Sequence, residues 1–377
     1  MTTSSRHDIC LFLALVLLSA GLFFLPSAPQ MVESESGFKG TAKVEKVDDS
    51  GVAVHDLVLF GTQRLEVKLL HGPHKGESYY AENELRANLE LDKLFKVGDR
   101  VIVVSSQEDI GEGSVLVAQN YARNGWTIIL FGAFCILLCV FGRLTGFNAL
   151  LSFVFSCLLI WKAVIPLVLR GWSASWTIFA CVVFLTAVIM ALVAGITKCG
   201  ICAFFGAISG VFVGLFTAHF FTWVMNINGA TLPYSQALLF SGYENINLQN
   251  IFVGAMILAS SGAVMDLAMD ISSGIQEVAK HNPALGQLEL TKSGLRMGRN
   301  VVGTMTTTLL LAYSGGYITL LMMFAAKGAS LESIINNPLV AAEIVKTLIG
   351  SFSLVLVAPF TAFLGGWFFK PKSANAN

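Results

Sequence analysis

Two carboxylates inside an apolar stretch carry the clearest chemical signal in this sequence. Asp266 and Asp270 lie four residues apart in the apolar run 251–271, so a helix places both on one face. An ionisable side chain at the centre of a membrane helix costs roughly 2.5–3.5 kcal/mol, and its presence there needs a reason. The pair therefore predicts a site that binds a cation or a proton. The alternative is that both carboxylates simply reach interfacial water at the end of the helix.

The next apolar run, residues 301–325, is rich in hydroxyl groups and contains a sequence that interrupts a helix. The polar residues Asn300, Thr304, Thr307 and Ser314 recur at spacings of four, three and seven, so a helix places them on one face. Two glycines, Gly315 and Gly316, follow Ser314. Transporters use broken helices to coordinate ions or polar substrates, whereas a kink packed on a neighbour has the same sequence signature. Two serines midway along the preceding run face this break if the two helices pack together. The predicted substrate or ion site comprises Asp266, Asp270, Ser260, Ser261, Asn300, Thr304, Thr307, Ser314 and Gly315.

The elements that position these residues are membrane helices. Of the 377 residues, 55% are hydrophobic and 13% are charged, against roughly 25% charged in soluble proteins, which excludes an all-soluble protein. Segments that cross a hydrocarbon core about 30 Å thick satisfy their own backbone as helices. Eight apolar runs are long enough, or nearly long enough, to cross this core as helices, at residues 9–25, 126–141, 147–169, 176–195, 201–225, 251–271, 301–325 and 339–369. The first lacks a clear A-x-A cleavage site and is predicted to be a retained anchor rather than a cleaved signal peptide.

Most of the acidic charge lies in a polar block between the first two runs. Residues 33–120 hold 16 of the 24 Asp and Glu and 10 of the 24 Lys and Arg, so the block is acidic and lacks the basic face that nucleic acid requires. Alternating apolar residues predict five short strands, at residues 39–47, 57–69, 77–80, 96–104 and 114–119, which fit an OB-like barrel or a sandwich. The predicted domains are an anchor helix (1–32), a β domain (33–120) and a seven-helix transmembrane domain (121–377).

The distribution of basic residues predicts the orientation of these helices. With the N-terminus inside, nine Lys and Arg of the connecting segments and ends face the cytoplasm, and three (Arg123, Arg170 and Lys327) face outside. Both termini are then cytoplasmic and the β domain is extracytoplasmic. In the longest cytoplasmic loop, Asn282-Pro283 predicts the start of a short interfacial helix that ends at Ser293-Gly294.

Other candidate groups give weaker predictions. Lys162 on the third predicted helix is a candidate partner for Glu343 at the start of the eighth. His71 and His74 lack the third ligand that a metal site needs, so no metal site and no cofactor are assigned. All seven cysteines lie in or beside apolar runs, which argues against a disulfide framework.

The segment Gly298–Tyr313, with Gly262-Ala263-Val264-Met265-Asp266 and Asn282-Pro283, resembles the YibE/F-like family of bacterial multi-pass membrane proteins. The resemblance covers about residues 120–370. It implies a permease or transporter of unassigned substrate in the bacterial inner membrane. The chain has Asn300 where the family usually has an acid and Thr307 where it has an asparagine, which leaves Asp266 as the strongest matching acid.

Two functional classes follow from these observations. The first is a secondary transporter for a small solute, ion or proton, in which Asp266 and the broken, hydroxyl-rich helix form the site. The second is a non-transporting scaffold or envelope-assembly factor that recruits a protein partner through its β domain, or assembles as a homo-oligomer. An enzyme is not predicted, because the sequence has no H-E-x-x-H motif and two Asp on one helix do not form a converging dyad.

Overall fold

The chain folds into two compact units. The computed structural model describes residues 3–25, 37–107, 110–111 and 113–370. One unit, the barrel unit, comprises Gln30–Leu137, and the other, the helical unit, comprises Met1–Pro29 with Leu138–Asn377.

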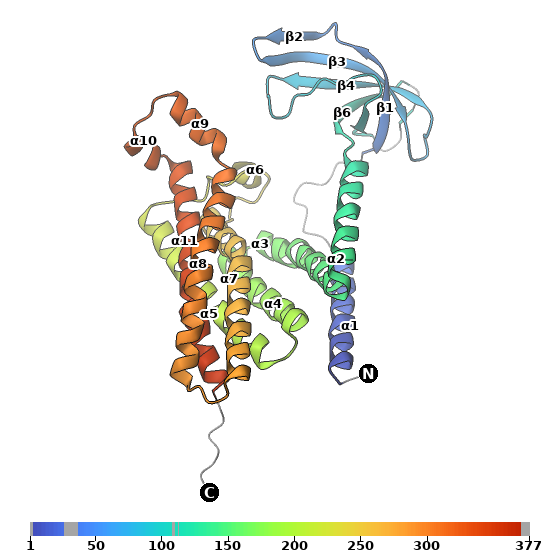
Figure 1. Ribbon diagram of the computed structural model, residues 1–377. Helices are drawn as coiled ribbons and strands as arrows, with labels where there is room; N and C mark the ends of the chain where they lie inside the picture. The colour runs from blue at the N-terminus through green and yellow to red at the C-terminus, as the bar shows by residue number, and fades with distance from the viewer. Residues whose placement is uncertain (1–2, 26–36, 108–109, 112, 371–377) are drawn as a thin grey trace. The chain divides into compact units, whose positions relative to one another are not determined.

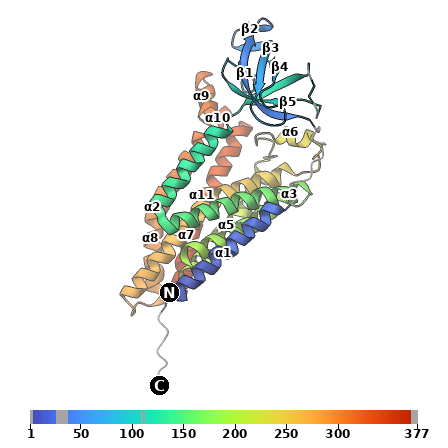
Figure 2. The ribbon, with the colours of Figure 1, turned by 90° about the vertical axis from the view of Figure 1, so that its right-hand side faces the viewer.

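The barrel unit contains a closed β-barrel (Figure 2). Its strands are β1 (Lys39–Asp48), β2 (Val52–His55), β3 (Val58–Leu69), β4 (Ser78–Arg86), β5 (Arg100–Val104) and β6 (Val115–Tyr121). Strand β1 pairs with both β3 and β5, and β4 pairs with β6 in parallel, so five strands close in the order β1-β3-β4-β6-β5. The prediction of an OB-like barrel or a sandwich is thereby confirmed in its barrel form.

Strict alternation of side chains builds the barrel interior. Along β4, buried and exposed residues alternate at every position, and Val44, Val67 and Leu116 are among the fully buried residues contributed by other strands. Strand β2 was absent from the sequence prediction. It is only four residues long and pairs with β3 across a tight turn at Asp56, whose φ of 52° is left-handed.

A buried amide network holds the β4–β5 loop against the barrel. The Gln63 side chain is fully buried; its Nε2 donates to the Phe95 carbonyl at 2.9 Å and to Asp49 Oδ1 at 2.8 Å. Its Oε1 accepts from the Phe95 backbone N–H and from Asn83 Nδ2, both at 3.0 Å. Asn83 Nδ2 also donates to the Lys93 carbonyl at 2.7 Å. Every polar atom of the Gln63 amide is therefore satisfied without water.

The rest of the described chain is helical (Figure 1). The helices are α1 (Thr3–Phe24), α2 (Asn124–Leu159), η1 (Ile160–Val164), α3 (Ile165–Leu169), α4 (Ala174–Ala194), α5 (Lys198–Val224), α6 (Ser235–Phe240), α7 (Leu248–His281), α8 (Gln287–Gly315), α9 (Ile318–Ala326), α10 (Leu331–Ile335) and α11 (Pro338–Phe368). The backbone of Arg143 is not helical, so α2 is divided there into two segments, Asn124–Arg143 and one that begins at Gly146 and continues through η1 and α3 to Leu169. Among the described residues, six helical segments are long and apolar enough to cross a membrane, or seven if the bent pair α8–α9 is counted as one broken span. Helix α1 adds the shorter apolar segment Leu13–Phe24. The predicted α-helical membrane fold is confirmed.

Helix α11 lies at the centre of the helical unit, packed on α5, α7 and α8. Close approach depends on glycine: Cβ atoms on Gly206, Gly210 and Gly214 of α5 would collide with Thr361, Val357 and Ser353 of α11. The repeat of a small residue every four positions thus has the packing role that its spacing predicts.

The predicted interfacial helix ending at Ser293-Gly294 is wrong. Helix α7 continues to His281, and α8 begins at Gln287 and runs through Gly294 without interruption. Tertiary packing explains the continuity, because a Cβ on Gly294 would lie 3.0 Å from Ala362 Cβ of α11 and equally close to Ile275 Cγ1 of α7. Gly294 is a contact point between helices rather than a helix end.

Candidate functional site

Helices α7 and α8 run antiparallel and bring the predicted acids and hydroxyls to the same level. Gly274 contacts Met297, and a Cβ on Gly298 would lie 3.1 Å from Ile271 Cδ1. Continuing this register places Asp270 level with Asn300. Asp266 lies one turn further along α7, level with Thr304.

The predicted acids and most of the predicted α8 residues share an exposed face. Asp266 and Asp270 are exposed, as are Asn300, Thr304 and Thr307, whereas Ile275 and Gly298 on the other side of the two helices pack against α11. No hydrogen bond or ion pair of the Asp266 or Asp270 carboxylate occurs among the described residues. The two acids of α7 and the polar residues of α8 therefore lie side by side on one face, and the acids make no side-chain hydrogen bond to those α8 residues.

The predicted hydroxyls bond to their own helices. Thr304 Oγ1 donates to the Val301 carbonyl at 2.9 Å, and Ser314 Oγ donates to that of Leu311 at 3.2 Å. Thr307, Ser260 and Ser261 donate in the same way to carbonyls three or four residues earlier. This back-bonding satisfies each hydroxyl locally and leaves its oxygen able to accept a further bond.

Ser260 and Ser261 lie away from the acidic face. Both are buried, and a Cβ on Gly350 of α11 would lie 3.4 Å from Ser260 Cβ and 3.7 Å from Tyr313 Cε2 of α8. Ser260 thus approaches α8 near its C-terminal end, across α11. Ser260 and Tyr313, the residue before the break, therefore adjoin the same position of α11.

The break predicted at Ser314-Gly315-Gly316 is present. Helix α8 ends at Gly315, α9 begins at Ile318, and the two are bent by 67°. In Figure 1, α9 and α10 lie at the end of the helical unit opposite the C-terminal end of α11. The bend prevents α8 and α9 from forming one straight span.

The break adjoins a group of ionisable and aromatic side chains from α8, the start of α9 and α11 that the sequence pattern does not bring together. Lys346 Nζ of α11 lies 3.2 Å from Glu343 Oε1, and the two side chains are only 23% and 15% exposed. The same ammonium lies 5.1 Å from the ring centroid of Tyr313 and 5.9 Å from that of Tyr317. We call these four residues the ammonium cluster.

A cavity of about 320 Å³ opens beside this cluster. Its lining includes Tyr313, Ser314, Tyr317 and Glu343, and the remainder is almost entirely aliphatic. Of the predicted site residues, only Ser314 lines it. A cavity of this size with few polar groups has the character of a small-molecule site.

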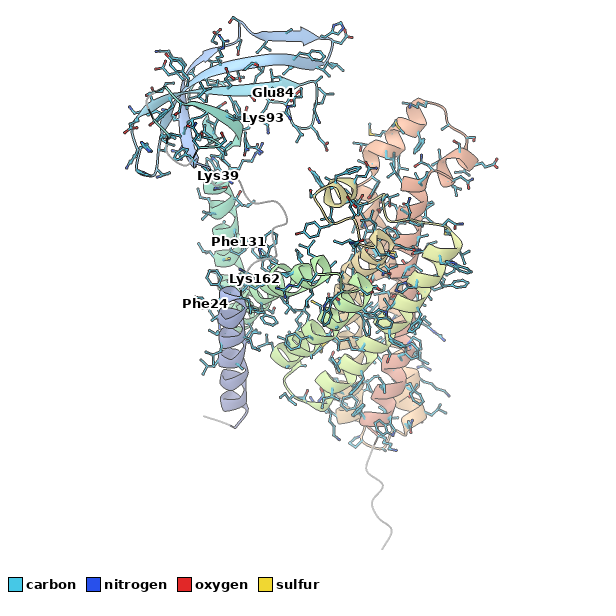
Figure 3. The ribbon with its side chains drawn as sticks, turned by 180° about the vertical axis from the view of Figure 1, so that it is seen from behind. Phe24, Lys39, Glu84, Lys93, Phe131 and Lys162 are labelled. Atoms are coloured by element: carbon cyan, nitrogen blue, oxygen red, sulfur yellow. The ribbon has the colours of Figure 1, made fainter. Side chains whose placement is uncertain are left out.

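The predicted pair of Lys162 with Glu343 is wrong. Lys162 Nζ donates to the Leu25 carbonyl just after α1, at 3.0 Å, and Glu343 pairs with Lys346 on its own helix. Figure 3 labels Lys162 near Phe24, the last residue of α1. The charges of Glu343 and Lys346 in an apolar run were a visible signal. Their tyrosine neighbours were not, because they lie about 30 residues earlier in the sequence.

The barrel unit contains one small polar group of its own. Glu77 Oε2 accepts from Tyr79 Oη at 2.6 Å and lies 3.1 Å from His74 Nδ1. These hydrogen bonds, that of Tyr79 first, lower the pKa of the Glu77 carboxyl. Within the described part of the chain, no three His, Cys, Asp or Glu side chains are grouped as a metal site would require.

Comparison with known families agrees with this architecture. Residues 130–371 match the family model described as YibE/F-like protein, and residues 41–117 match the one described as YibE/F family N-terminal domain. The chain belongs to the YibE/F-like family. The first match covers the segment Gly298–Tyr313 of α8 and the ammonium cluster, and the second covers most of the barrel.

No curated protein and no solved structure matches the chain. Membership of the YibE/F-like family, together with the apolar helices, shows a multi-pass membrane protein.

Proposed function

We propose that the helical unit transports a small solute or ion and that its binding site lies at the break between α8 and α9. The observation that carries this proposal is the 67° bend beside a cavity lined by Glu343, which forms a largely buried ion pair with Lys346. Ionisable groups are costly within a membrane and usually mark a substrate or ion pathway. Discontinuous helices likewise expose backbone groups that bind polar ligands.

Asp266 lies outside this cavity and has a separate role in the proposal. It lies near the middle of α7, a helix of 34 residues and therefore about 51 Å long. An exposed carboxylate at membrane depth needs water or a polar partner. We assign to Asp266, together with Asp270, the binding of a coupling cation or proton on the face shared with Asn300 and Thr304.

The proposed setting is the bacterial inner membrane, with both termini in the cytoplasm and the barrel outside. The basic residues of the connecting segments support this orientation. We propose no enzymatic activity. The lipid bilayer and the transported solute or ion are the proposed partners.

Currents across a reconstituted membrane test the proposal. The purified full chain in liposomes on a solid-supported membrane is exposed to jumps of NaCl, KCl, butylammonium chloride and pH. We expect a current with at least one probe, reduced by Asp266→Asn and retained by Asp56→Asn, a matched change in the barrel unit. Currents equal to those of protein-free liposomes for all four probes would refute transport.

The barrel unit supports a second candidate function, that of an envelope scaffold. It has a hydrophobic core of its own and a closed sheet, independent of the helices. Replacing residues 38–121 by a flexible linker separates the two functions. A transporter retains its currents after this deletion, whereas a scaffold loses its cellular function while its helical unit remains intact.

A further inference from the structure

The ammonium cluster has the composition of a cation-recognition site. A carboxylate and two aromatic faces surround one ammonium group, and both ring centroids lie within the roughly 6 Å over which cation–π attraction acts. We infer that Glu343, Tyr313 and Tyr317 form a cage for the primary ammonium group of a ligand, and that the chain's own Lys346 occupies the cage in this structure. This inference deepens the proposed function, on which its consequence for transport rests, by naming the ligand class.

The cage has unused hydrogen-bonding capacity. Glu343 Oε2 and Tyr313 Oη are both buried and have no hydrogen-bond partner among the described residues. Lys346 contacts only the other carboxylate oxygen, Oε1. A primary ammonium has three N–H donors, enough for one hydrogen bond to each of these oxygens.

The cavity indicates what the rest of the ligand is. Beside Glu343 and the two tyrosines, its walls are formed by the aliphatic side chains of Leu310, Leu320, Leu321, Val340, Ile344 and Leu348. Such walls favour an apolar chain attached to the ammonium group. The ligand class is therefore a primary ammonium on an alkyl chain, as in a free amine. The ethanolamine headgroup of a lipid offers the same ammonium on a shorter chain that ends at a phosphate, and it is the competing source.

Lys346 acts as a tethered competitor for this ligand. It lies three residues from Glu343 on the same helix and is 23% exposed, so its flexible stem can carry the ammonium out of the cage without moving the backbone. A competitor held by the chain is present at a high effective concentration. Removing the charge of Lys346 leaves Glu343 without its ion-pair partner. The ammonium group of a ligand can then take the place of Lys346, so the ligand should bind more tightly.

Calorimetric binding of butylammonium to the full chain in phosphatidylcholine nanodiscs tests the inference. We expect Lys346→Met to bind roughly tenfold more tightly than the wild type. Lys327→Met, which removes an exposed charge at the end of α9, should leave the affinity unchanged. In the Lys346→Met background, Glu343→Gln and Tyr313→Leu should each weaken binding about tenfold or more.

Two probes define the chemistry. Butanol lacks the charge and tetramethylammonium lacks N–H donors, so both should bind more weakly than butylammonium. Equal binding of butanol, or no gain in Lys346→Met over Lys327→Met, would overturn the inference. Should Lys346→Met fail to fold, thermal stabilisation of the wild type by butylammonium supports the inference, and stabilisation equal to that by butanol overturns it.

The source of the ammonium is decided by the lipid. If phosphatidylethanolamine in the nanodisc lowers the apparent affinity for butylammonium, the cage takes a lipid headgroup; if it has no effect, the ligand is a free amine. Binding without any current refutes transport but leaves the cage in place. Currents from a protein that binds no butylammonium refute the cage alone.

Discussion

Replacing Gly210 by alanine tests whether the α5–α11 contact is as tight as the structure indicates. A Cβ at this position would lie 2.9 Å from Val357 Cβ, 3.2 Å from the Ser353 carbonyl oxygen and 3.3 Å from Val357 Cα. None of these atoms is the end of a flexible side chain, so the helices themselves must separate. Overpacking of this kind costs about 1–3 kcal/mol.

Alanine also brings a gain that must be subtracted. It favours the helix over glycine by about 0.8–1 kcal/mol. The net expectation for Gly210→Ala is a loss of roughly 0–2 kcal/mol in the free energy of unfolding. For a unit of this size, each kcal/mol lowers the melting temperature by about 2–4 °C, so we expect a decrease of at most roughly 8 °C.

Gly262→Ala is the matched control. This glycine lies on the exposed face of α7, and a Cβ there would meet no atom within 4 Å. Only the helix-propensity gain applies, so the melting temperature should rise or stay the same. Thermal unfolding of both variants in detergent, followed by tryptophan fluorescence, makes the comparison. A Gly210→Ala protein as stable as Gly262→Ala would refute the close α5–α11 packing.

Three further predictions concern the barrel unit. Gln63→Ala leaves the Phe95 backbone N–H and carbonyl without a side-chain partner and removes one of the two acceptors of Asn83 Nδ2. This loss should cost about 3 kcal/mol and speed hydrogen exchange at residues 93–96, whereas exposed Gln107→Ala should not. The Glu77 pKa is lower in the folded protein, so the contribution of this carboxylate to stability is present above the unfolded pKa of about 4.3 and is lost as the pH falls. Glu77→Gln should therefore make the stability of the barrel less dependent on pH on the acid side. An unchanged pH dependence would contradict the hydrogen bond from Tyr79. In intact cells, exposed Ser106→Cys should react with a membrane-impermeant maleimide from outside, and labelling only after lysis would reverse the proposed orientation.

Much of the fold was predictable because its signals are local. Apolar length marks the helices and alternation marks the barrel strands, since both arise from the solvent around each segment. The break after Ser314 was readable for the same reason, because two adjacent glycines interrupt the apolar pattern. Strand β2 was not predicted, because its four residues are too few to show a clear alternation of apolar and polar side chains.

The sequence by itself determined that this is a multi-helix membrane protein with a β domain, and which residues share a face within one helix. Only the tertiary structure decided which faces meet. Helical periodicity relates residues three or four positions apart, whereas the contact of Lys346 with Tyr313 joins α11 to α8 across 33 positions. That neighbourhood depends on where small residues such as Gly350 and Gly298 let the helices approach, and on the 67° bend that turns Tyr317 toward α11.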